Sequence, residues 1–335
     1  MRRPISLPVL LAAVALVSSV CCARNSPPQT GTNTGGFRRG SPSEPADQPT
    51  PRTDANSRLA HTQLLEKARK GGIDIYFEGD SITRRWGASD PQYKENLANW
   101  TANFFGWNAA DFGWGADLTQ NILWRLENGE LDGVNPKIII VLAGINNVGA
   151  RPPDDAKIAD ITRGLKAILD VCRKKAPDAT IIMTAIFPRN DNMAVIPGIN
   201  RINKNIAQFA DGKKVRYLNV NDKLADRNGR LFDGMMNPAD KLHPTVKGYQ
   251  VWADGLKPIF TELLGAPAKT DHAPSPTGDP GANRGAGPAS QPPVSRPLRD
   301  ADGSTDIKEI EKPPACIKKA DMNKTPRSGR FSSDR

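Results

Sequence analysis

Two short, uninterrupted apolar runs constrain the fold of this chain more than any other feature. Residues 138–142 read Ile-Ile-Ile-Val-Leu, and residues 180–183 read Thr-Ile-Ile-Met. A strand with one face in water alternates apolar and polar residues, whereas a strand covered on both faces is apolar throughout. The two runs therefore predict buried strands of a parallel sheet, which needs helices on both of its faces.

Strand and helix patterns alternate between residues 57 and 265. The predicted strands are residues 73–78, 107–112, 137–143, 179–187 and 215–220. The predicted helices are residues 57–70, 91–101, 118–127, 156–174, 199–211 and 245–264. Strands that alternate with helices predict an α/β fold, a three-layer sandwich with a parallel sheet between two layers of helices.

The two ends of the chain differ from this middle part. Residues 1–23 place Arg2 and Arg3 before a short apolar run that ends in small residues, which is typical of a cleaved secretory signal. Residues 24–56 and 266–335 are rich in Pro, Gly and polar residues without hydrophobic periodicity. We therefore expect a disordered linker, a folded domain over residues 57–265 and a disordered tail.

The leader predicts export to the periplasm or the extracellular space. An uncleaved anchor is one alternative, but the apolar run is shorter than the about 20 residues that a membrane-spanning helix needs. A lipid on Cys21 or Cys22 is another, although the leucine usual in lipoprotein signals is absent before them. Cys172 and Cys316 then remain, so no disulfide framework is predicted and Cys172 is expected in the core.

Charge and composition exclude several classes of partner. The net charge is +10, but the basic residues are not interleaved with aromatic residues as in nucleic-acid-binding motifs, so no nucleic-acid partner is expected. The basic tails are compatible with weak association with an anionic cell envelope. Four Cys and three His are too few for metal clusters, and the segment 79–81 lacks the further glycines of a phosphate-binding loop. No metal and no cofactor are expected.

Polar residues follow the predicted strands at the end where parallel sheets bind ligands. The segments are 79–82 (Gly-Asp-Ser-Ile), 113–117 (Gly-Trp-Gly-Ala-Asp), 144–147 (Gly-Ile-Asn-Asn) and, before the last helix, 240–244 (Asp-Lys-Leu-His-Pro). A serine hydrolase needs a hydroxyl nucleophile, an imidazole base, a carboxylate that orients the imidazole and donors for an oxyanion. The four segments supply candidates for all four parts.

His243 is the only plausible base. His272 lies in the tail, and His61 lies on the helix before the first strand, away from the carboxyl ends of the strands. Asp240 precedes His243 by three residues, so its carboxylate could reach the ring nitrogen that faces away from Ser81.

Each of these residues also has a structural explanation when it is taken alone. Gly-Asp-Ser is common as a turn or helix cap, Asn146 could satisfy a turn, and His243 before Pro244 could be a loop residue. Their occurrence together, in order and at strand ends, favours an active serine hydrolase.

With these residues in place, the segment from about Ile73 to Leu264 resembles the SGNH (GDSL-type) hydrolase family. Within the family it is most similar to bacterial relatives of the platelet-activating-factor acetylhydrolase catalytic subunits. The similarity runs through residues 112–120, 123–131 and 144–147. The resemblance implies a flavodoxin-like fold with a five-stranded parallel sheet, and hydrolysis of esters, often acetyl esters, without a metal.

The resemblance also implies roles for the candidate residues. Ser81 is the nucleophile, His243 the base and Asp240 its orienting acid, while Asn146 and the backbone N–H of Ser81 donate to the oxyanion.

A further oxyanion donor, usually a glycine, falls on Ala116 in this sequence, with Gly115 just before it. Either residue could supply the N–H. Because alanine reaches positive φ less readily than glycine, the direction of the Ala116 N–H is left open.

The function expected is that of a serine esterase for short-chain, chiefly acetyl, esters, acting on a small ester or an acetylated glycan. The acyl group is expected to be small if Trp86, Trp114 and neighbouring bulky side chains close over the site. A lysophospholipase or thioesterase would need a long apolar groove, and no long apolar insertion is present to build one. A glycan-binding envelope protein without turnover would lack a member of the catalytic set, and none is missing.

Overall fold

Five parallel strands form the central sheet, and every residue of the first four strands is buried. The strands are β1 (Ile75–Gly79), β2 (Ala109–Asp111), β3 (Ile138–Leu142), β4 (Thr180–Thr184) and β5 (Val215–Leu218). They pair in the order β2-β1-β3-β4-β5, each parallel to its neighbour. The computed structural model describes residues 44–282, so the predicted signal over residues 1–23 lies outside the described residues.

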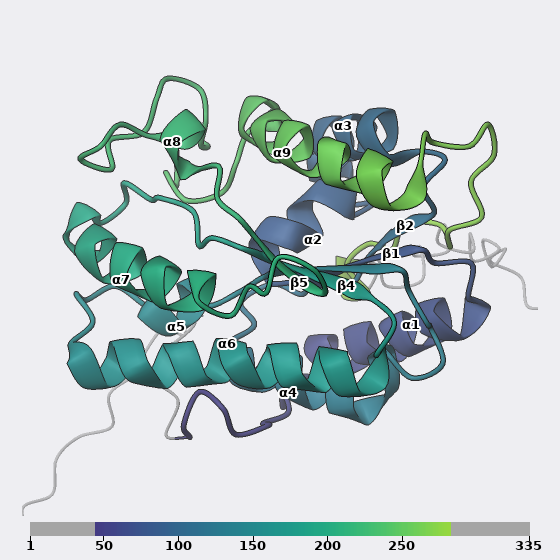
Figure 1. Cartoon of the computed structure of the whole chain (residues 1–335), viewed down its shortest axis with the longest axis horizontal. Coiled ribbons are helices and arrows are strands. Elements are labelled where there is room, and N and C mark those ends of the chain that lie inside the picture. Colours follow the sequence, from purple (N-terminus) through teal and green to yellow (C-terminus); the bar gives the residue numbers. More distant parts are fainter. Residues whose placement is uncertain (1–43, 283–335) are drawn as a thin grey trace, which may run out of the picture. The chain divides into compact units, whose positions relative to one another are not determined.

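Helices cover both faces of the sheet. They are α1 (Ala55–Lys70), α2 (Ser81–Gly87), α3 (Lys94–Phe104), α4 (Thr119–Arg125), α5 (Ile145–Val148), α6 (Asp155–Lys175), α7 (Ile196–Ala207), α8 (Asn221–Leu224) and α9 (Val246–Leu264). Shorter helical turns are η1 (Pro91–Tyr93), η2 (Leu126–Glu130) and η3 (Met193–Val195). Figure 1 shows α2, α3 and α9 on one side of the sheet and α1, α4, α6 and α7 on the other. The predicted α/β three-layer sandwich is confirmed.

The strand order reverses between β1 and β3. The chain passes from β1 to β2 at one edge and then returns past β1 to β3. In such sheets ligands bind where the order reverses, beyond the carboxyl ends of the strands. Two short helices begin at this place, α2 at Ser81 and α5 at Ile145. Neither was predicted, because seven and four residues are too few to show a helical period.

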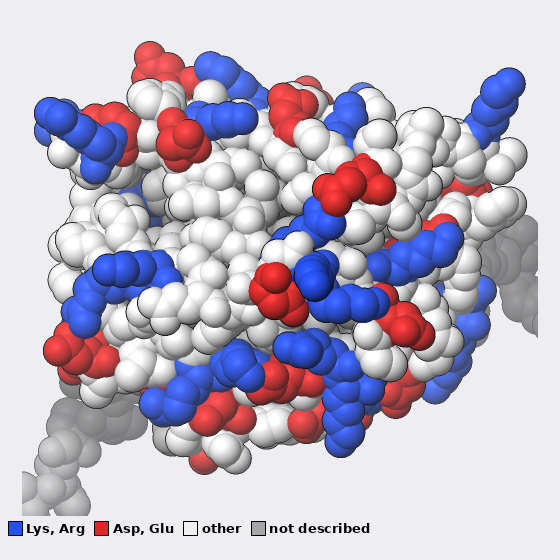
Figure 2. Space-filling view, in the orientation of Figure 1, with Lys and Arg blue, Asp and Glu red and all other residues white. Residues whose placement is uncertain are grey.

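The face of the molecule seen in Figure 2 carries charged side chains of both signs. Lys and Arg lie beside Asp and Glu over much of this face, and an uncharged area lies between α7 and α8. Ion pairs at the protein surface include Arg201 with Asp155 at 2.7 Å and Arg216 with Glu262 at 2.6 Å. This mixture differs from the continuous basic stripe that a nucleic-acid-binding surface presents.

Trp86 belongs to the hydrophobic core, so it does not meet the condition under which it would limit the acyl group. Its side chain is fully buried, and its ring stacks on Tyr249 and Trp252 at centroid distances of 4.9 and 5.0 Å. The indole N–H donates to Asn99 Oδ1 at 2.9 Å. Trp86 therefore holds α2 against α9. Cys172 is fully buried in the core, as predicted.

The folded part begins before residue 57. Residues 44–50 run alongside α4, whose first three side chains hold their backbone. Thr119 Oγ1 donates to Ala46 O at 2.7 Å, Gln120 Nε2 to Glu44 O at 2.9 Å and Asn121 Nδ2 to Thr50 O at 2.9 Å. The predicted linker over residues 24–56 is thus corrected for residues 44–56. The contacts are polar and go to the backbone, so they leave no hydrophobic period in the sequence.

The folded part also continues beyond residue 265. The segment after α9 lies against the approach to β2, where Ala268 N donates to Gly106 O at 2.9 Å and Gly106 N donates to Asp271 Oδ2 at 2.7 Å. Gly106 has a φ of 89°, and a Cβ there would lie 2.1 Å from Ala268 O, so only glycine allows this approach. The predicted tail is corrected for residues 266–282, and its remainder lies outside the described residues. None of the helices in residues 44–282 is long and apolar enough to cross a membrane.

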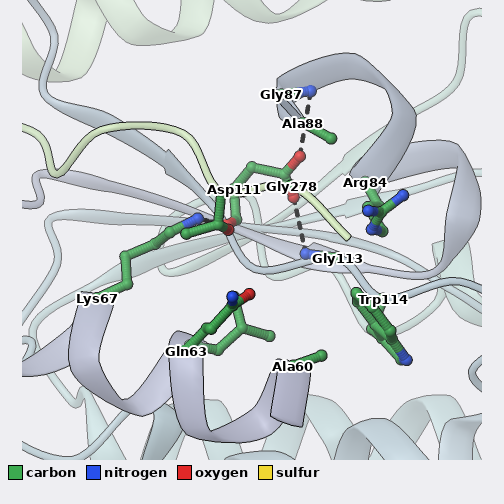
Figure 3. Close-up of a pocket in the computed structure, with 12 residues that line it drawn as sticks. Ala60, Gln63, Lys67, Arg84, Gly87, Ala88, Asp111, Gly113, Trp114 and Gly278 are labelled. Carbon is green, nitrogen blue, oxygen red and sulfur yellow. Dashed lines mark hydrogen bonds between the residues drawn. The ribbon is translucent and has the colours of Figure 1, made fainter. Parts of the chain in front are cut away.

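Asp111, at the end of β2, joins α2 to the loop that follows β2. Figure 3 shows its carboxylate between the backbone N–H groups of Gly87 and Gly113, at 3.1 and 2.7 Å. The ammonium of Lys67 on α1 donates to the Asp111 carbonyl at 2.7 Å. Burial lowers the pKa of Lys67 to about 8 and raises that of Asp111 to about 6. The cavity beside them, about 10 Å³, has room for about one water and none for a substrate.

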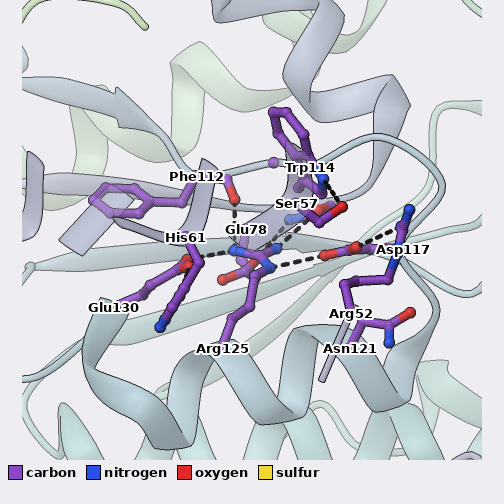
Figure 4. A network of polar contacts seen from close by, with 12 residues as sticks. Arg52, Ser57, His61, Glu78, Phe112, Trp114, Asp117, Asn121, Arg125 and Glu130 are labelled. Carbon is purple, nitrogen blue, oxygen red and sulfur yellow. Dashed lines mark hydrogen bonds and ion pairs between the residues drawn. The ribbon is translucent and has the colours of Figure 1, made fainter. Parts of the chain in front are cut away.

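A cluster of buried charges centres on Arg125, at the end of α4 (Figure 4). Its Nη2 lies 2.7 Å from Glu78 Oε1, its Nε lies 2.8 Å from Asp117 Oδ2, and its Nη1 bonds to Glu130 Oε2. The arginine side chain is 5% exposed and the three carboxylates are fully buried. Burial raises the pKa of Glu78 to about 8 and that of Asp117 to about 6, against the pull of Arg125. Arg125 therefore offsets much of the cost of three buried carboxylates.

We predict that Arg125→Met lowers the free energy of unfolding by about 3–5 kcal/mol, because the substitution leaves buried carboxylates without their main cation. Urea denaturation followed by circular dichroism measures the change. Arg163→Met is the matched control, since Arg163 is half exposed and its pairs with Asp160 and Asp47 should contribute about 1 kcal/mol or less. An equal decrease in the free energy of unfolding in the two variants would show that the buried cluster contributes no more to stability than a surface ion pair does.

Candidate active site

Ser81 is the first residue of α2, directly after β1. Asp80 caps the helix, and its Oδ1 accepts the N–H of Ile82 at 2.9 Å. A Cβ on Gly79 would lie 2.1 Å from Thr83 Oγ1 and 2.5 Å from Leu142 O, so the strand turns into the helix in a space that only glycine fits. The backbone N–H of Ser81 thus belongs to the first helical turn, whose N–H groups have no partner within the helix.

The structure brings Ser81, His243 and Asp240 into one hydrogen-bonded chain. His243 Nε2 lies 2.9 Å from Ser81 Oγ, and His243 Nδ1 lies 2.8 Å from Asp240 Oδ2. The other oxygen, Asp240 Oδ1, accepts the backbone N–H groups of Leu242 and His243 at 3.1 and 3.0 Å. The carboxylate is therefore fixed by its own loop, and it faces the ring nitrogen remote from Ser81.

Burial and a nearby arginine hold the imidazole neutral. His243 is 8% exposed, and burial lowers its pKa below the ordinary value of histidine. Arg85 lowers it further, and Asp240 opposes both effects. Burial alone would raise the pKa of Asp240, but the hydrogen bonds from His243 and Leu242 outweigh burial and keep that pKa below its ordinary value. A neutral imidazole beside an ionised carboxylate can accept a proton from a hydroxyl.

Arg85 is a residue of this site that the sequence reasoning missed. Its Nη1 lies 3.3 Å from Asp240 Oδ2, the same oxygen that faces His243 Nδ1. Arg85 follows Ser81 by four residues, which places both side chains on one face of α2. That spacing was the signal in the sequence, but Arg84 and Arg85 together resemble an ordinary exposed basic pair.

Asn146 lies in α5, close to the loop that follows β2. Its Nδ2 donates to the carbonyl of Asp117 at 2.9 Å, so one of its two N–H bonds is used and the other remains for a ligand. Gly144, which precedes α5, has a φ of 102° and allows the turn from β3 into the helix. The neighbouring Asn147 is buried and bonds to the N–H and side chain of Thr119, so its role is structural.

Ala116 has a φ of 64°, in the left-handed region that was expected to disfavour alanine. The conformation costs an alanine roughly 1–2 kcal/mol, so its surroundings must hold it. Arg52 Nη1 donates to the carbonyl of Gly115 at 3.1 Å, and Arg52 and Arg125 both pair with Asp117. Hydrogen bonds and ion pairs from Arg52 and Arg125 therefore fix Gly115 and Asp117, the residues on either side of Ala116.

Trp114 is held against α1. Figure 4 shows its indole N–H directed at Ser57 Oγ, a 2.8 Å hydrogen bond to α1, and the residue is buried. His61 lies in the Arg125 cluster, with its Nδ1 2.7 Å from Glu130 Oε1. Among residues 44–282, no group of three or more His, Cys, Asp or Glu side chains could hold a metal ion.

Comparison with known proteins agrees with this geometry. Residues 77–251 match the GDSL-like Lipase/Acylhydrolase family. The chain is 28% identical over 242 residues to platelet-activating factor acetylhydrolase IB subunit alpha1 of Bos taurus, covering 70% of this chain and 97% of that protein. It is 29% identical over 209 residues to platelet-activating factor acetylhydrolase IB subunit alpha2 of Homo sapiens, covering 61% of this chain and 83% of that protein.

A solved structure shows the same fold. It is that of a candidate acylhydrolase from Bacteroides fragilis, with a TM-score of 0.50 and 16% identity over 64% of this chain and 100% of that one. The match of the family over more than half of the chain decides the classification. The chain belongs to the GDSL-like lipase/acylhydrolase family, whose members are hydrolases that act on ester bonds.

Proposed function

We propose that this protein is a serine esterase that hydrolyses short-chain, chiefly acetyl, esters through Ser81, His243 and Asp240. The observation that carries the proposal is the continuous hydrogen-bonded chain from Ser81 Oγ through both ring nitrogens to Asp240, with links of 2.9 and 2.8 Å. Nucleophile, base and orienting carboxylate in this geometry are the requirements of acyl transfer through serine.

In the first half of the reaction Ser81 Oγ attacks the ester carbonyl carbon, and His243 Nε2 takes the serine proton. Asp240 holds the Nδ1–H and stabilises the imidazolium. The oxyanion accepts hydrogen bonds from Asn146 Nδ2, from the N–H of Ser81, and from the N–H of Gly115 or Ala116. The intermediate collapses, the alcohol leaves with the proton from His243, and an acyl group remains on Ser81.

In the second half a water molecule attacks the acyl-enzyme. His243 takes a proton from this water, and the same donors hold the second oxyanion. Collapse releases the carboxylic acid and returns the proton to Ser81 Oγ, which regenerates the starting state. The proton transfers are supported by the 2.9 Å distance between Ser81 Oγ and His243 Nε2.

Acetyl is the preferred acyl group because the curated relatives that cover most of this chain are acetylhydrolases by name. A lysophospholipase or thioesterase activity is the alternative that a chain-length series decides. The proposal includes export, from the leader over residues 1–23, and action on small esters or acetylated glycans. Weak envelope association through the basic tails, and lipid attachment at Cys21 or Cys22, are tested separately by cell fractionation.

We expect kcat/KM on p-nitrophenyl esters from acetate to palmitate to be highest for acetate and to fall by about 10³ or more in Ser81→Ala, as removal of a catalytic nucleophile predicts. Ser89→Ala is the matched control, because Ser89 is exposed and lies outside the hydrogen-bonded chain. Full activity in Ser81→Ala would refute the mechanism, and a maximum at palmitate would identify a lipase.

We expect Asn146→Ala to lower kcat by about 10²–10³, the usual effect of losing one oxyanion donor, with a small change in KM. Asn205→Ala is the control, since Asn205 Nδ2 bonds to Thr162 between α7 and α6. Steady-state kinetics on p-nitrophenyl acetate measures the effect. A rise in KM at unchanged kcat would show that Asn146 contributes only to substrate binding.

The pH dependence of kcat/KM should report the titration of His243. The imidazole must be neutral to act as base, and its pKa is lowered by burial and by Arg85, so activity should persist below the ordinary pKa range of histidine. Arg85→Gln removes a positive charge, which favours the imidazolium and raises the pKa. The acidic limb should therefore move to higher pH in Arg85→Gln and stay in place in Arg163→Gln. A limb that moves to lower pH would contradict this assignment.

A further inference from the structure

A cleft of about 410 Å³ opens between α7 and α8, and the proposed mechanism does not use it. Its volume lies within the range of small-molecule sites. The lining includes Asn200, Asn221, Asp222, Asp226, Arg227 and Phe232. Because Asn221 lies three residues after the end of β5, the cleft lies at the carboxyl ends of the strands, as does Ser81 after β1.

The wall of the cleft is joined to the loop that carries His243. Asn190 lies between them, and its backbone N–H donates to Lys241 O at 2.9 Å. Its side chain donates to Gly229 O at 2.7 Å and accepts the N–H of Leu231 at 3.0 Å. Gly229 lines the cleft, and Lys241 is two residues from His243. Asn190 therefore links the cleft wall at Gly229 to the loop that carries His243.

The chemistry of the lining is mixed. Five of its ten residues carry polar or charged side chains, and the three charged ones sum to one negative charge. Asn221 Nδ2 donates to Ile186 O at 2.9 Å, while its buried Oδ1 has no hydrogen-bond partner among the described residues. That atom is closed off from the cleft, so a ligand would meet the exposed side chains of Asn200 and Asp222 instead. A long acyl chain would leave these polar groups unpaired, which disfavours a lipid tail as occupant.

Phe232 supplies the apolar surface of the cleft. Its side chain is 43% exposed, although a large apolar side chain is usually buried. Its backbone N–H donates to Leu224 O at 2.9 Å, and a bridge between Ala225 and Leu231 closes the loop before it. An exposed aromatic ring on a fixed loop, beside amide and carboxylate groups, matches a ligand with one apolar face and a rim of hydroxyls.

We propose that this cleft is a subsite for a neutral saccharide ring in the alcohol part of the ester. Phe232 stacks on the apolar face of the sugar, and the exposed Asn200 and Asp222 bond to its hydroxyls. The inference rests on the proposed esterase function and specifies its substrate class.

The test compares acetylated xylo-oligosaccharides with p-nitrophenyl acetate, which has no saccharide. Phe232→Ala should raise KM for the acetylated oligosaccharides about fivefold or more through loss of the aromatic contact, and leave KM for p-nitrophenyl acetate unchanged. Phe232→Tyr, which keeps the ring, should behave as wild type. The control is Phe105→Ala, since the side chain of Phe105 is also exposed, at 52%. Phe105 follows α3 and precedes β2, so it lies at the amino ends of the strands, away from the cleft.

Direct binding separates a failure of the subsite from a failure of the esterase. Isothermal titration of xylohexaose into Ser81→Ala should give binding that the added Phe232→Ala weakens about fivefold or more and Phe105→Ala does not. Absence of binding, or equal binding in all variants, overturns the subsite even if p-nitrophenyl acetate is hydrolysed. A KM that Phe232→Ala raises for p-nitrophenyl palmitate alone also overturns it, because the cleft would then hold the acyl chain.

Discussion

The placement of one guanidinium inside the protein underlies the geometry of the whole site. Arg125 contacts the carboxylates of Glu78, Asp117 and Glu130, and it also donates to Phe112 O at 3.0 Å. These groups come from the end of β1, the loop after β2 and the turn η2. A buried ion cluster is weak evidence for stability, because desolvation opposes the Coulomb attraction. Its clearer effect is to fix positions, since the planar guanidinium donates hydrogen bonds in only a few directions.

The same cluster explains how an alanine occupies a left-handed position in the loop after β2. Asp117 is tied to Arg125 through its carboxylate and to Asn146 through its carbonyl. The turn that contains Ala116 is thereby held from the interior and from α5 at once. Backbone strain persists where the surroundings over-determine it, and it concentrates at functional sites. The left-handed conformation of Ala116 thus depends on the buried Arg125, which holds the next residue, Asp117.

The fold and the three central side chains could be predicted from sequence because each left a local signal. Apolar runs such as residues 138–142 predict buried strands, and His243 was the one histidine left near the ends of the strands. Arg85 and Arg125 could not be predicted, since a charged residue on a helix gives the same pattern whether it faces water or a buried partner. The place of Trp86 was left open for a related reason, because sequence does not tell whether an aromatic ring faces the core or a site.

The segment after α9 has a consequence for how the sheet meets other chains. The edges of a sheet carry unpaired N–H and C=O groups, which another strand can join. At one edge lies β2, with only three residues, and the residues that lead into it are already bonded to the backbone of the returning chain at Ala268 and to Asp271. The N–H and C=O of Gly106, just before β2, are therefore not free to pair with an incoming strand. The polar C-terminal segment thus protects this edge of the sheet from growing by strand addition, the step that begins ordered aggregation.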